Sequence, residues 1–317
     1  ESMPTSADVA KRANVSKMTV SRVINHPEQV TDELKELVFS AMAELDYRPN
    51  IAAKALVTNR SQIIKLFILE EIDTTEPYYM NLLMGIAKRI GKAHYSLQLV
   101  TNDAFDVGSC DGYIITGVRK KDFDWIDRLE KPVVLFGENC EGYDYVDSDN
   151  EYGTAKATQY ALERDYQTII YIGIEVDESF ELSREAGYLS VMKEADLPSK
   201  ILRFPNHSTE VERYMIENWA GFTDKTCFVC SSDRLALGAV RGIVNAGGHL
   251  PEEFGVIGFD GVFLDQISSP KLTTIKQDII RMGEVCGEML LKKIEEKGAS
   301  QGYRRFFPEL VIRETTN

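Results

Sequence analysis

A basic segment near the start of the chain has the residue types that bind a polyanion. Residues 11–25 contain Lys11, Arg12, Lys17 and Arg22 and no acidic residue. Lysine and arginine attract phosphate groups, and arginine can also donate two parallel hydrogen bonds to a guanine base. An ordinary solvated surface can have the same composition, so the charge pattern alone leaves both interpretations open.

The net charge of −14 is distributed unevenly along the 317 residues. Residues 1–60 hold eight Lys and Arg and eight Asp and Glu, whereas the rest holds 28 basic and 42 acidic residues. The excess of negative charge therefore belongs to the later part of the chain. One face of a small early domain can attract DNA while the acidic remainder is repelled from it.

Short helices are predicted to position the basic segment. Thr5 and Ser16 are good helix caps, and Asn14 between them tolerates a tight turn. In the second helix, expected over residues 17–25, the inward-facing apolar residues are Val20, Val23 and Ile24. The side chains left on the outer face are Lys17, Met18, Ser21 and Arg22. With a third helix over residues 31–45, this pattern predicts a helix-turn-helix domain.

The remainder has the pattern of an α/β protein. The spacing of Asn50, Ala53 and Leu56 predicts a helical stretch over residues 50–57 that is too short to be stable without a partner. From residue 61 onward, short apolar runs alternate with amphipathic segments, which is typical of parallel-sheet units. The expected strands are 63–69, 96–101, 112–116, 132–136, 168–174, 200–204, 226–231 and 255–259. The expected helices are 78–93, 150–164, 181–195, 208–219, 233–246 and 278–297.

Other kinds of chemistry are disfavoured. Five scattered cysteines, an odd number, predict reduced thiols. Cys227 and Cys230 have the spacing of a metal or redox pair, but their apolar surroundings predict a buried strand. Because neither metal-ligand spacing nor a catalytic arrangement is recognisable, we expect no metal, no cofactor and no enzyme activity. No apolar run reaches the ~18–20 residues of a membrane span and no signal-peptide pattern is present, so we expect a cytoplasmic protein without membrane contact.

The sequence resembles the lactose-repressor (LacI/GalR) family of bacterial transcription regulators. The match is closest over residues 8–25 and 43–50 and is looser in the core. Core motifs that match the family begin at Asp111, Pro132, Asp149, Arg184, Ser232, Ile257 and Thr273. The resemblance thus covers nearly the whole chain.

The resemblance implies a fold of the α/β class in three parts. These are a helix-turn-helix headpiece (3–48), a hinge helix with linker (49–61) and a periplasmic-binding-protein-like core (62–317). The core is expected to contain two Rossmann-like parallel-sheet subdomains, the first covering about 62–147 and 277–306 and the second about 148–276 and 307–317. Crossings between them are expected near Asp147, Lys276 and Phe306.

The resemblance also assigns DNA contacts. The residues expected to contact bases are Lys17, Met18 and Arg22, although Arg22 can also contact phosphate or solvent. The headpiece residues expected to contact the backbone are Thr5, Ser16, Thr19, Ser21 and Asn25, of which Thr19 and Ser21 can equally be caps and surface. The hinge residues expected at the backbone or minor groove are Asn50, Ala53, Lys54 and Leu56. Leu56 would insert between base steps as an apolar wedge, unless it simply packs against the core.

An effector site is expected in the core. The residues assigned to it are Tyr78, Tyr79, Gly137, Arg184, Ser232, Asp233 and Asp260. Because open α/β sheets bind ligands at the carboxyl ends of their strands, Tyr78, Gly137 and Asp260 are also expected near a cleft on that ground alone. Asp233 and Asp260 can instead be a helix cap and a strand end. This chain has Gly137 and Glu138 where the family often has a ligand-binding aspartate, which disfavours a plain sugar and leaves a phosphorylated or acidic effector, or a partner protein, as alternatives.

These expectations describe a transcriptional regulator, most simply a repressor. It would bind a pseudo-palindromic operator as a homodimer and respond to a sugar, sugar phosphate or sugar acid, with a partner protein as corepressor as an alternative. Whether the ligand releases DNA or promotes binding stays open. The rival interpretations are a transport or chemotaxis binding protein and an α/β enzyme such as a sugar kinase. The helix-turn-helix pattern opposes the first, and the lack of a phosphate loop or catalytic motif opposes the second.

Overall fold

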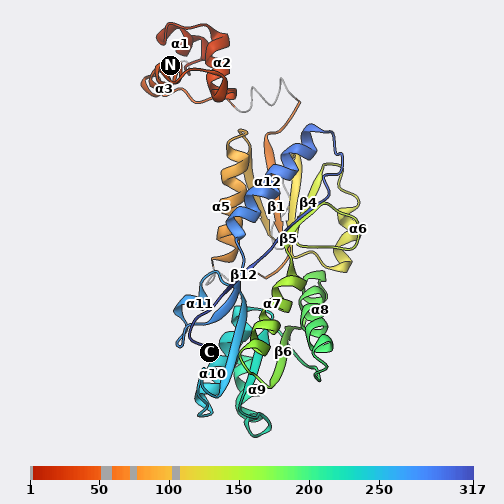
Figure 1. Cartoon of the computed structure of the whole chain (residues 1–317). Coiled ribbons are helices and arrows are strands. Elements are labelled where there is room, and N and C mark those ends of the chain that lie inside the picture. Colours follow the sequence, from red (N-terminus) through yellow and green to blue (C-terminus); the bar gives the residue numbers. More distant parts are fainter. Residues whose placement is uncertain (1–2, 51–58, 72–76, 102–107) are drawn as a thin grey trace. The chain divides into compact units, whose positions relative to one another are not determined.

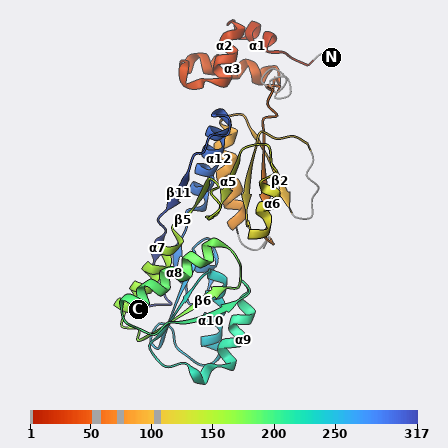
Figure 2. The same ribbon diagram turned by 90° about the vertical axis from the view of Figure 1, so that its right-hand side faces the viewer.

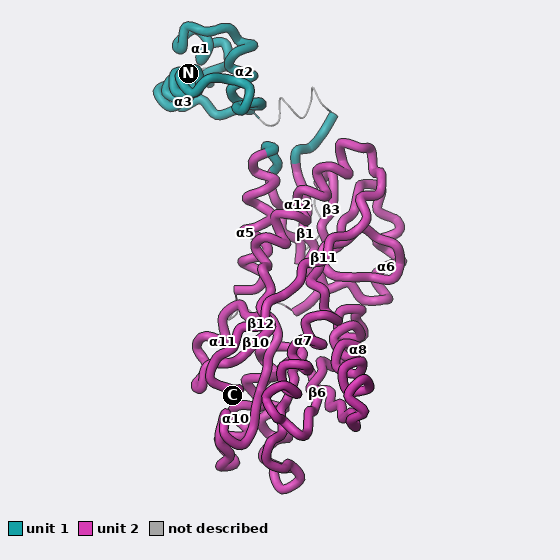
Figure 3. The backbone as a smooth tube through the Cα atoms, in the orientation of Figure 1, with its two compact units in different colours: residues 1–62, 93–95 teal, residues 63–92, 96–317 magenta. Residues whose placement is uncertain are grey.

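The computed structural model of the chain (Figure 1) describes residues 3–50, 59–71, 77–101 and 108–317. It divides into two units, which Figure 3 shows in different colours. Unit 1 comprises residues 1–62 and 93–95, and unit 2 comprises residues 63–92 and 96–317. The predicted hinge helix, with Ala53, Lys54 and Leu56, lies outside the described residues. Each unit is described by itself below.

Unit 1 contains the headpiece, a bundle of three helices. They are α1 (Ser6–Arg12), α2 (Lys17–Asn25) and α3 (Asp32–Glu44), with a 3₁₀ turn, η1 (Pro27–Gln29), before α3. The helix starts are capped by Thr5, Ser16 and Thr31, whose side chains accept hydrogen bonds from backbone N–H groups one turn later. The core side chains with no exposed surface are Val9, Val20, Val23 and Val38. The predicted helix-turn-helix is therefore confirmed.

The first lobe of unit 2 is built on a six-stranded parallel sheet with the order β11-β5-β4-β3-β1-β2. Its strands are β1 (Ile63–Ile68), β2 (Ser96–Thr101), β3 (Gly112–Thr116), β4 (Val133–Phe136), β5 (Tyr145–Ser148) and β11 (Tyr303–Phe306). Its helices are α5 (Tyr78–Gly91), η2 (Lys120–Asp122), α6 (Phe123–Ile126) and α12 (Ile279–Glu295). The long helices α5 and α12 pack against each other (Figure 1), so closely that a Cβ at Gly85 would overlap the carbonyl of Ile280.

The second lobe is built on a sheet with the order β12-β10-β9-β8-β6-β7. Its strands are β6 (Thr168–Ile174), β7 (Lys200–Phe204), β8 (Thr226–Cys230), β9 (Phe254–Asp260), β10 (Thr273–Lys276) and the antiparallel β12 (Glu309–Val311). Its helices are α7 (Asn150–Glu163), α8 (Ser179–Glu194), α9 (Ser208–Glu217), η3 (Trp219–Gly221), α10 (Asp233–Asn245) and α11 (Leu264–Ile267).

Both faces of the second sheet are buried. Along β6, Ile170 and Ile172 pack into one apolar cluster, whereas Ile169 and Tyr171 pack into another. This alternation follows from the two-residue period of a strand and explains why the strand reads as a continuous apolar run. Cys227 and Cys230 lie buried as free thiols in β8, as predicted, and burial raises the pKa of the Cys227 thiol.

The chain passes between the two sheets three times. The passages follow β5, separate β10 from α12, and separate β11 from β12, and Figure 2 shows both lobes from the side. The strand prediction missed β5, β10, β11 and β12. In β11 three of the four side chains are exposed, so this edge strand has no apolar run for a pattern to detect. Among the described residues, no helix combines the length and apolarity needed to cross a bilayer.

Candidate functional site

The outer face of α2 carries the residues predicted to contact bases. Lys17, Met18 and Arg22 are all exposed, and Met18 has 69% of its surface accessible. Met18 precedes Arg22 by one helical turn, so the two side chains lie on the same side of α2. Val20 and Val23 on the opposite side anchor the helix in the headpiece core. The headpiece thus presents a mixed basic and apolar surface on a rigid helix.

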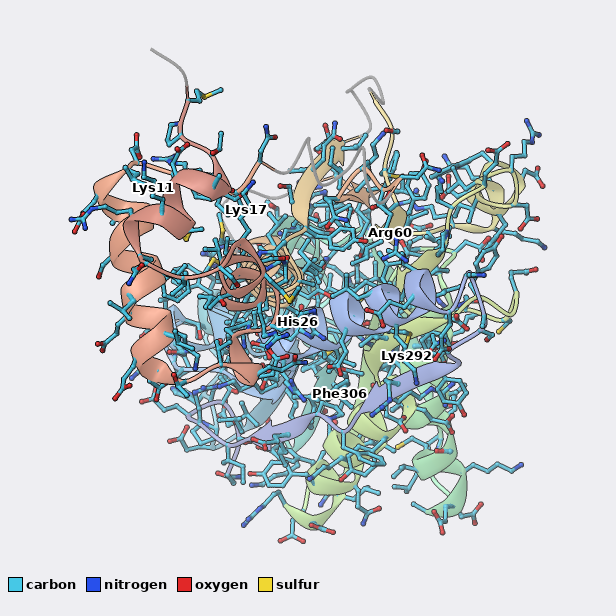
Figure 4. The ribbon with its side chains drawn as sticks, turned by 90° about the horizontal axis from the view of Figure 1, so that it is seen from above. Lys11, Lys17, His26, Arg60, Lys292 and Phe306 are labelled. Carbon is cyan, nitrogen blue, oxygen red and sulfur yellow. The ribbon has the colours of Figure 1, made fainter. Side chains whose placement is uncertain are left out.

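Three of the four cations in the basic segment form no ion pair within the part of the chain that the structure describes. Arg12 forms an ion pair with Glu44 of α3, but Lys11, Lys17 and Arg22 form none with any described residue. Figure 4 labels Lys11 and Lys17 on the headpiece. The pKa of Asp8 is lowered mainly by its hydrogen bonds to Thr5, with smaller contributions from Lys11 and Lys17. The free cations are available to a polyanion such as DNA.

The predicted backbone contacts are surface polar groups that also stabilise the helix ends. The Thr5 hydroxyl and amide belong to a capping box with Asp8. The Ser16 hydroxyl accepts a hydrogen bond from the Thr19 amide at 3.0 Å, and Asn25 Nδ2 donates to the Ser21 carbonyl at 2.8 Å. Asn50 is exposed at the end of the described headpiece. These placements leave the contacts with phosphate as predictions.

A cavity of about 140 Å³ opens between the two lobes of unit 2. It lies where the strands of both sheets end, which is the position expected for a ligand site in open α/β sheets. Six of the seven predicted effector residues line it, namely Tyr78, Tyr79, Gly137, Arg184, Ser232 and Asp260. The structure therefore brings together residues that are 182 positions apart in the chain, from 78 to 260.

Arg184 is the most firmly held side chain of the cavity. Its Nε donates to Asn150 Oδ1 at 2.9 Å, and its Nη1 donates to the Ser231 carbonyl at 2.6 Å. The guanidinium carbon lies 3.7 Å from the centroid of the Phe259 ring. These contacts fix the guanidinium plane, so that a ligand meets a preorganised donor rather than a flexible cation.

Asp147 also lines the cavity, although the sequence pattern gave it no ligand role. Its carboxylate accepts hydrogen bonds from the amides of Glu138 at 2.8 Å and Ser148 at 2.7 Å, and from Asn150 Nδ2 at 3.1 Å. Burial raises the pKa of Asp147 to about 6, because desolvation of the charged form outweighs these hydrogen bonds. Asn150 is hydrogen-bonded to both the Asp147 carboxylate and Arg184, so the three side chains form one polar network at the cavity wall.

Asp260 ends β9 with an unusual backbone. Its φ of 127° lies in a region that side-chain-bearing residues rarely adopt. Its carboxylate accepts a hydrogen bond from Gln277 Nε2 at 2.8 Å. A strained residue that is held in place by its neighbours is typical of a binding site, so the geometry favours a ligand role over a plain strand end.

Asp233 does not line the cavity. It is 3% exposed, and its carboxylate accepts hydrogen bonds from Thr274 Oγ1 at 2.6 Å and from the Gly261 amide at 2.9 Å. Burial raises its pKa well above the usual value. Ser232, its neighbour, caps α10 through the Leu235 amide and donates to Asn206 Oδ1 at 2.6 Å. Asp233 thus ties β10 to the loop after β9.

The comparisons with known proteins agree with this two-part architecture. Residues 5–50 match the model for bacterial regulatory proteins of the lacI family, and residues 158–316 match that for a periplasmic binding protein-like domain. An uncharacterized HTH-type transcriptional regulator, YvdE of Bacillus subtilis (strain 168), is 53% identical over 315 residues, which cover 99% of this chain and all (100%) of the relative. The chain belongs to the LacI family.

Solved structures of LacI-family proteins share the fold. The lac repressor dimer bound to operator and the anti-inducer ONPF has a TM-score of 0.75 and 22% identity over 99% of each chain. The transcriptional regulator CelR in complex with cellobiose has a TM-score of 0.74 and 24% identity over 98% of this chain and 99% of that chain. The predicted fold class is confirmed. The relatives are transcriptional regulators. This confirms the expectation that the protein is a DNA-binding regulator and not an enzyme.

Acidic side chains missed by the sequence analysis form much of the cavity wall in this LacI-family regulator. Glu70, Glu71 and Glu178 line it together with Asp147 and Asp260, and the arginines among the described lining residues are Arg184 and Arg234. A signal for two of the acids was present, because Glu70 and Glu71 lie two and three residues after the end of β1 at Ile68, and Asp260 ends β9. Glu178 gave no comparable signal, since it precedes a helix rather than ending a strand.

Glu138, which with Gly137 stands where the family often has an aspartate, is not among the residues that line the cavity. Its carboxylate accepts hydrogen bonds from the Ser183 hydroxyl and, at 3.4 Å, from Asn150 Nδ2. Ser183 lies on α8 and Glu138 follows β4, so this contact joins the two lobes. Many members of the family have a ligand-binding aspartate at this point of the chain. Here Gly137 and Glu138 stand in its place, and Glu138 makes a contact between the lobes.

Proposed function

We propose that this LacI-family regulator is a repressor that binds a pseudo-palindromic operator as a homodimer and responds to a small neutral sugar in the interlobe cavity. The observation that carries the DNA part is the exposed face of α2, where Met18 is exposed and Lys17 and Arg22 form no ion pair with any residue that the structure describes. This is the element that enters the major groove in helix-turn-helix proteins.

Base recognition is assigned residue by residue. Arg22 would donate two hydrogen bonds to a guanine, and Met18 would make an apolar contact with a thymine methyl group. Lys17 would contact a base edge at the start of α2. The surface polar groups Thr5, Ser16, Thr19, Ser21 and Asn25 would contact phosphates, which set the register of the helix without reading sequence.

The hinge residues are proposed to act in the minor groove. Asn50, Ala53 and Lys54 would contact the DNA backbone or groove, and Leu56 would insert as a wedge between base steps. The change Leu56→Ala is expected to abolish tight operator binding while the core still folds. A gel-shift titration at fixed salt checks this, and unchanged operator affinity would contradict it.

A homodimer is proposed because a palindromic site requires two-fold symmetry. The lac repressor in the structural comparison is a dimer on its operator. On unit 2, Met80 and Met84 are each 58% exposed on α5, and Ile280 on the adjoining α12 is 41% exposed. These side chains form an apolar patch suited to a second copy of the chain. Sedimentation of Met84→Glu should show more monomer than the unchanged protein, whereas Leu182→Glu on α8 serves as the control.

A neutral sugar is proposed because the cavity wall is acidic. A phosphate or carboxylate on the ligand would meet five carboxyl groups and two arginines, of which Arg184 is already bonded within the protein. Hydroxyl groups, in contrast, can donate hydrogen bonds to these carboxyl groups. CelR in the structural comparison is bound to cellobiose.

A thermal-shift screen tests the ligand class. Neutral sugars should include a ligand that raises the midpoint of unfolding, whereas sugar phosphates and sugar acids should not. Stabilisation by a phosphate or an acid alone would contradict the assignment. If neither class stabilises the protein, a partner protein as corepressor becomes the better interpretation. Adding the stabilising sugar to the gel shift then shows whether it releases DNA or promotes binding.

A further inference from the structure

The N-terminal end of α8, in the second lobe, contacts two loops of the first lobe. Glu138, in the loop after β4, accepts a hydrogen bond from the hydroxyl group of Ser183. Arg119, in the loop after β3, lies with Nε 3.7 Å from Oε1 of Glu178, the residue before α8. Because Glu178 lines the cavity, these contacts lie beside the site proposed for the effector. One end of a single helix thus carries side-chain contacts between the lobes.

Glu138 is anchored on the first-lobe side. Its backbone amide donates to Asp147 Oδ2 at 2.8 Å, and the amide of Gly137 donates to the Val146 carbonyl at 3.0 Å. Gly137 has a φ of 131°, which favours glycine at this turn. A glutamate on an anchored turn loses less freedom on binding Ser183 than a side chain on a mobile surface loop would lose. The contact therefore retains more of its hydrogen-bond energy.

Ser183 is equally well placed on the second-lobe side. It directly precedes Arg184, whose guanidinium group lines the cavity. Asn150 accepts a hydrogen bond from Arg184 Nε at 2.9 Å and donates one to Glu138 Oε2 at 3.4 Å. The cavity arginine and the hydroxyl group that reaches the other lobe are therefore consecutive residues of α8, and a displacement of this helix moves both.

Opening of the cavity would break the contacts at α8. The two lobes are connected by the three passages of the chain, which is the construction of a hinge. Rotation about these passages would separate Glu138 from Ser183 and Arg119 from Glu178, because the partners belong to different lobes. The apolar core clusters lie within single lobes and would stay intact. Polar contacts across the cleft therefore weigh strongly in the balance between the closed and open arrangements.

We propose that the Glu138–Ser183 hydrogen bond is a latch that stabilises the closed arrangement of the two lobes in the absence of effector. A hydrogen bond to a carboxylate contributes more than one between neutral groups. The Arg119–Glu178 ion pair assists the latch but is the weaker contact, because its atoms are 3.7 Å apart and the Arg119 side chain is 48% exposed.

The latch has a consequence for the effector that rests on the proposed function. The affinity of a ligand is reduced in proportion to the fraction of molecules in the arrangement that binds it. A chain that is already closed would therefore bind its sugar more tightly than one that has to close first. Closure itself can be measured without DNA or effector.

The test measures the distance between the lobes by pulsed electron paramagnetic resonance. Spin labels are attached at Asp124→Cys on α6 and Glu210→Cys on α9, two exposed positions in different lobes, with Cys140→Ser removing the exposed cysteine. The full chain without effector should show mainly the short distance. Ser183→Ala should lower the ratio of short to long distances by about tenfold, because one hydrogen bond to a carboxylate is lost. All samples are held at one pH, so that titration of Asp147 does not contribute.

Variants of Glu138 separate the hydrogen bond from the charge. Glu138→Ala should open the lobes as much as Ser183→Ala does. Since Ser183→Ala changes no charge, agreement between the two assigns the effect to the hydrogen bond. Glu138→Gln keeps a side-chain oxygen that can accept from Ser183 and should retain most of the short-distance population. The double alanine variant should be no more open than either single variant, because both remove the same contact.

Matched controls lie in the same loop and on the same helix. Glu141→Ala and Ser190→Ala, both at exposed positions, should leave the distances unchanged. Should Glu138→Ala fail to fold by circular dichroism, Ser183→Ala tests the same contact from the other lobe. Mainly long distances in the unchanged chain, additive effects in the double variant, or closed lobes in folded Ser183→Ala would overturn the proposal. None of these results depends on the gel shift or the sugar screen, so failure of the proposed function remains distinguishable.

Discussion

The α2 surface and the interlobe cavity are built in opposite ways. The surface takes Lys17, Met18 and Arg22 from one helix and leaves them exposed. The cavity takes its side chains from strand ends in two sheets and holds buried carboxyl groups whose protonation is favoured. A surface that binds a polyanion needs charged side chains exposed to water. A cavity that binds hydroxyl groups needs hydrogen-bond acceptors that are held in place and shielded from water. The same contrast predicts that perturbing the two sites gives different signatures.

The largest expected effect is the pH dependence contributed by Asp147. Its pKa is about 6 in the folded protein against 3.8 ordinarily, so it favours the folded state below pH 3.8, and this contribution is lost as pH rises through about 6. Between these limits the free energy of unfolding of Asp147→Asn should rise relative to the unchanged protein by roughly 3 kcal/mol. Urea titrations from pH 4 to pH 7 measure this difference.

The control for Asp147 is Asp124→Asn, an exposed carboxylate in the same lobe. Its difference from the unchanged protein should stay constant with pH. A constant difference for Asp147→Asn as well would mean that the cavity acids are as solvated as the surface ones, and the contrast between the two sites would disappear.

The next effect is loss of base discrimination at the headpiece. Arg22→Ala should weaken operator binding by about 2 kcal/mol and relax the preference at one base pair of each half-site, because a bidentate contact is lost. Competition gel shifts with single-base operator variants measure this. Lys35→Ala, on α3 and paired with Asp32, should leave the preference unchanged. Equal weakening on all operator variants would reassign Arg22 to phosphate.

The smallest effect is expected from Lys11→Ala. Lys11 is exposed and forms no ion pair with any described residue, but it lies outside the recognition helix. We expect a loss of only a few-fold in affinity, equal for operator and unrelated DNA, with the slope of log affinity against log salt reduced by about one. A change in base preference on this substitution would show that the reading surface extends onto α1.

The sequence predicted the headpiece well because its signals are local. Thr5 and Ser16 cap the helices they were expected to cap, and Val20 and Val23 are buried as their spacing implied. Six effector residues could be named because strand ends and family motifs are visible in the chain. Their contacts with ligand, like those of the headpiece with DNA, remain predictions.

The remaining features depend on tertiary contacts that no local pattern encodes. Asp233 turns inward because Thr274, on a strand that the pattern missed, offers it a hydrogen bond. Glu70 and Glu178 line the same cavity because the two lobes face each other there, and no pattern in the residues around Glu178 predicts that placement. The edge strands β11 and β12 pair with β5 and β10 because the fold places them there. Neither strand contains the run of buried apolar residues that a sequence pattern detects.

The three passages of the chain between the sheets have a consequence for synthesis on the ribosome. The first sheet receives β11 and the second receives β12, and both strands lie far along the chain, between Tyr303 and Val311. Domains generally fold as units while the chain emerges from its N-terminal end. The headpiece can therefore fold early, whereas neither sheet can be completed until residues 303–311 have left the ribosome. The nascent protein acquires its DNA-reading helices before it has a finished sensor to control them.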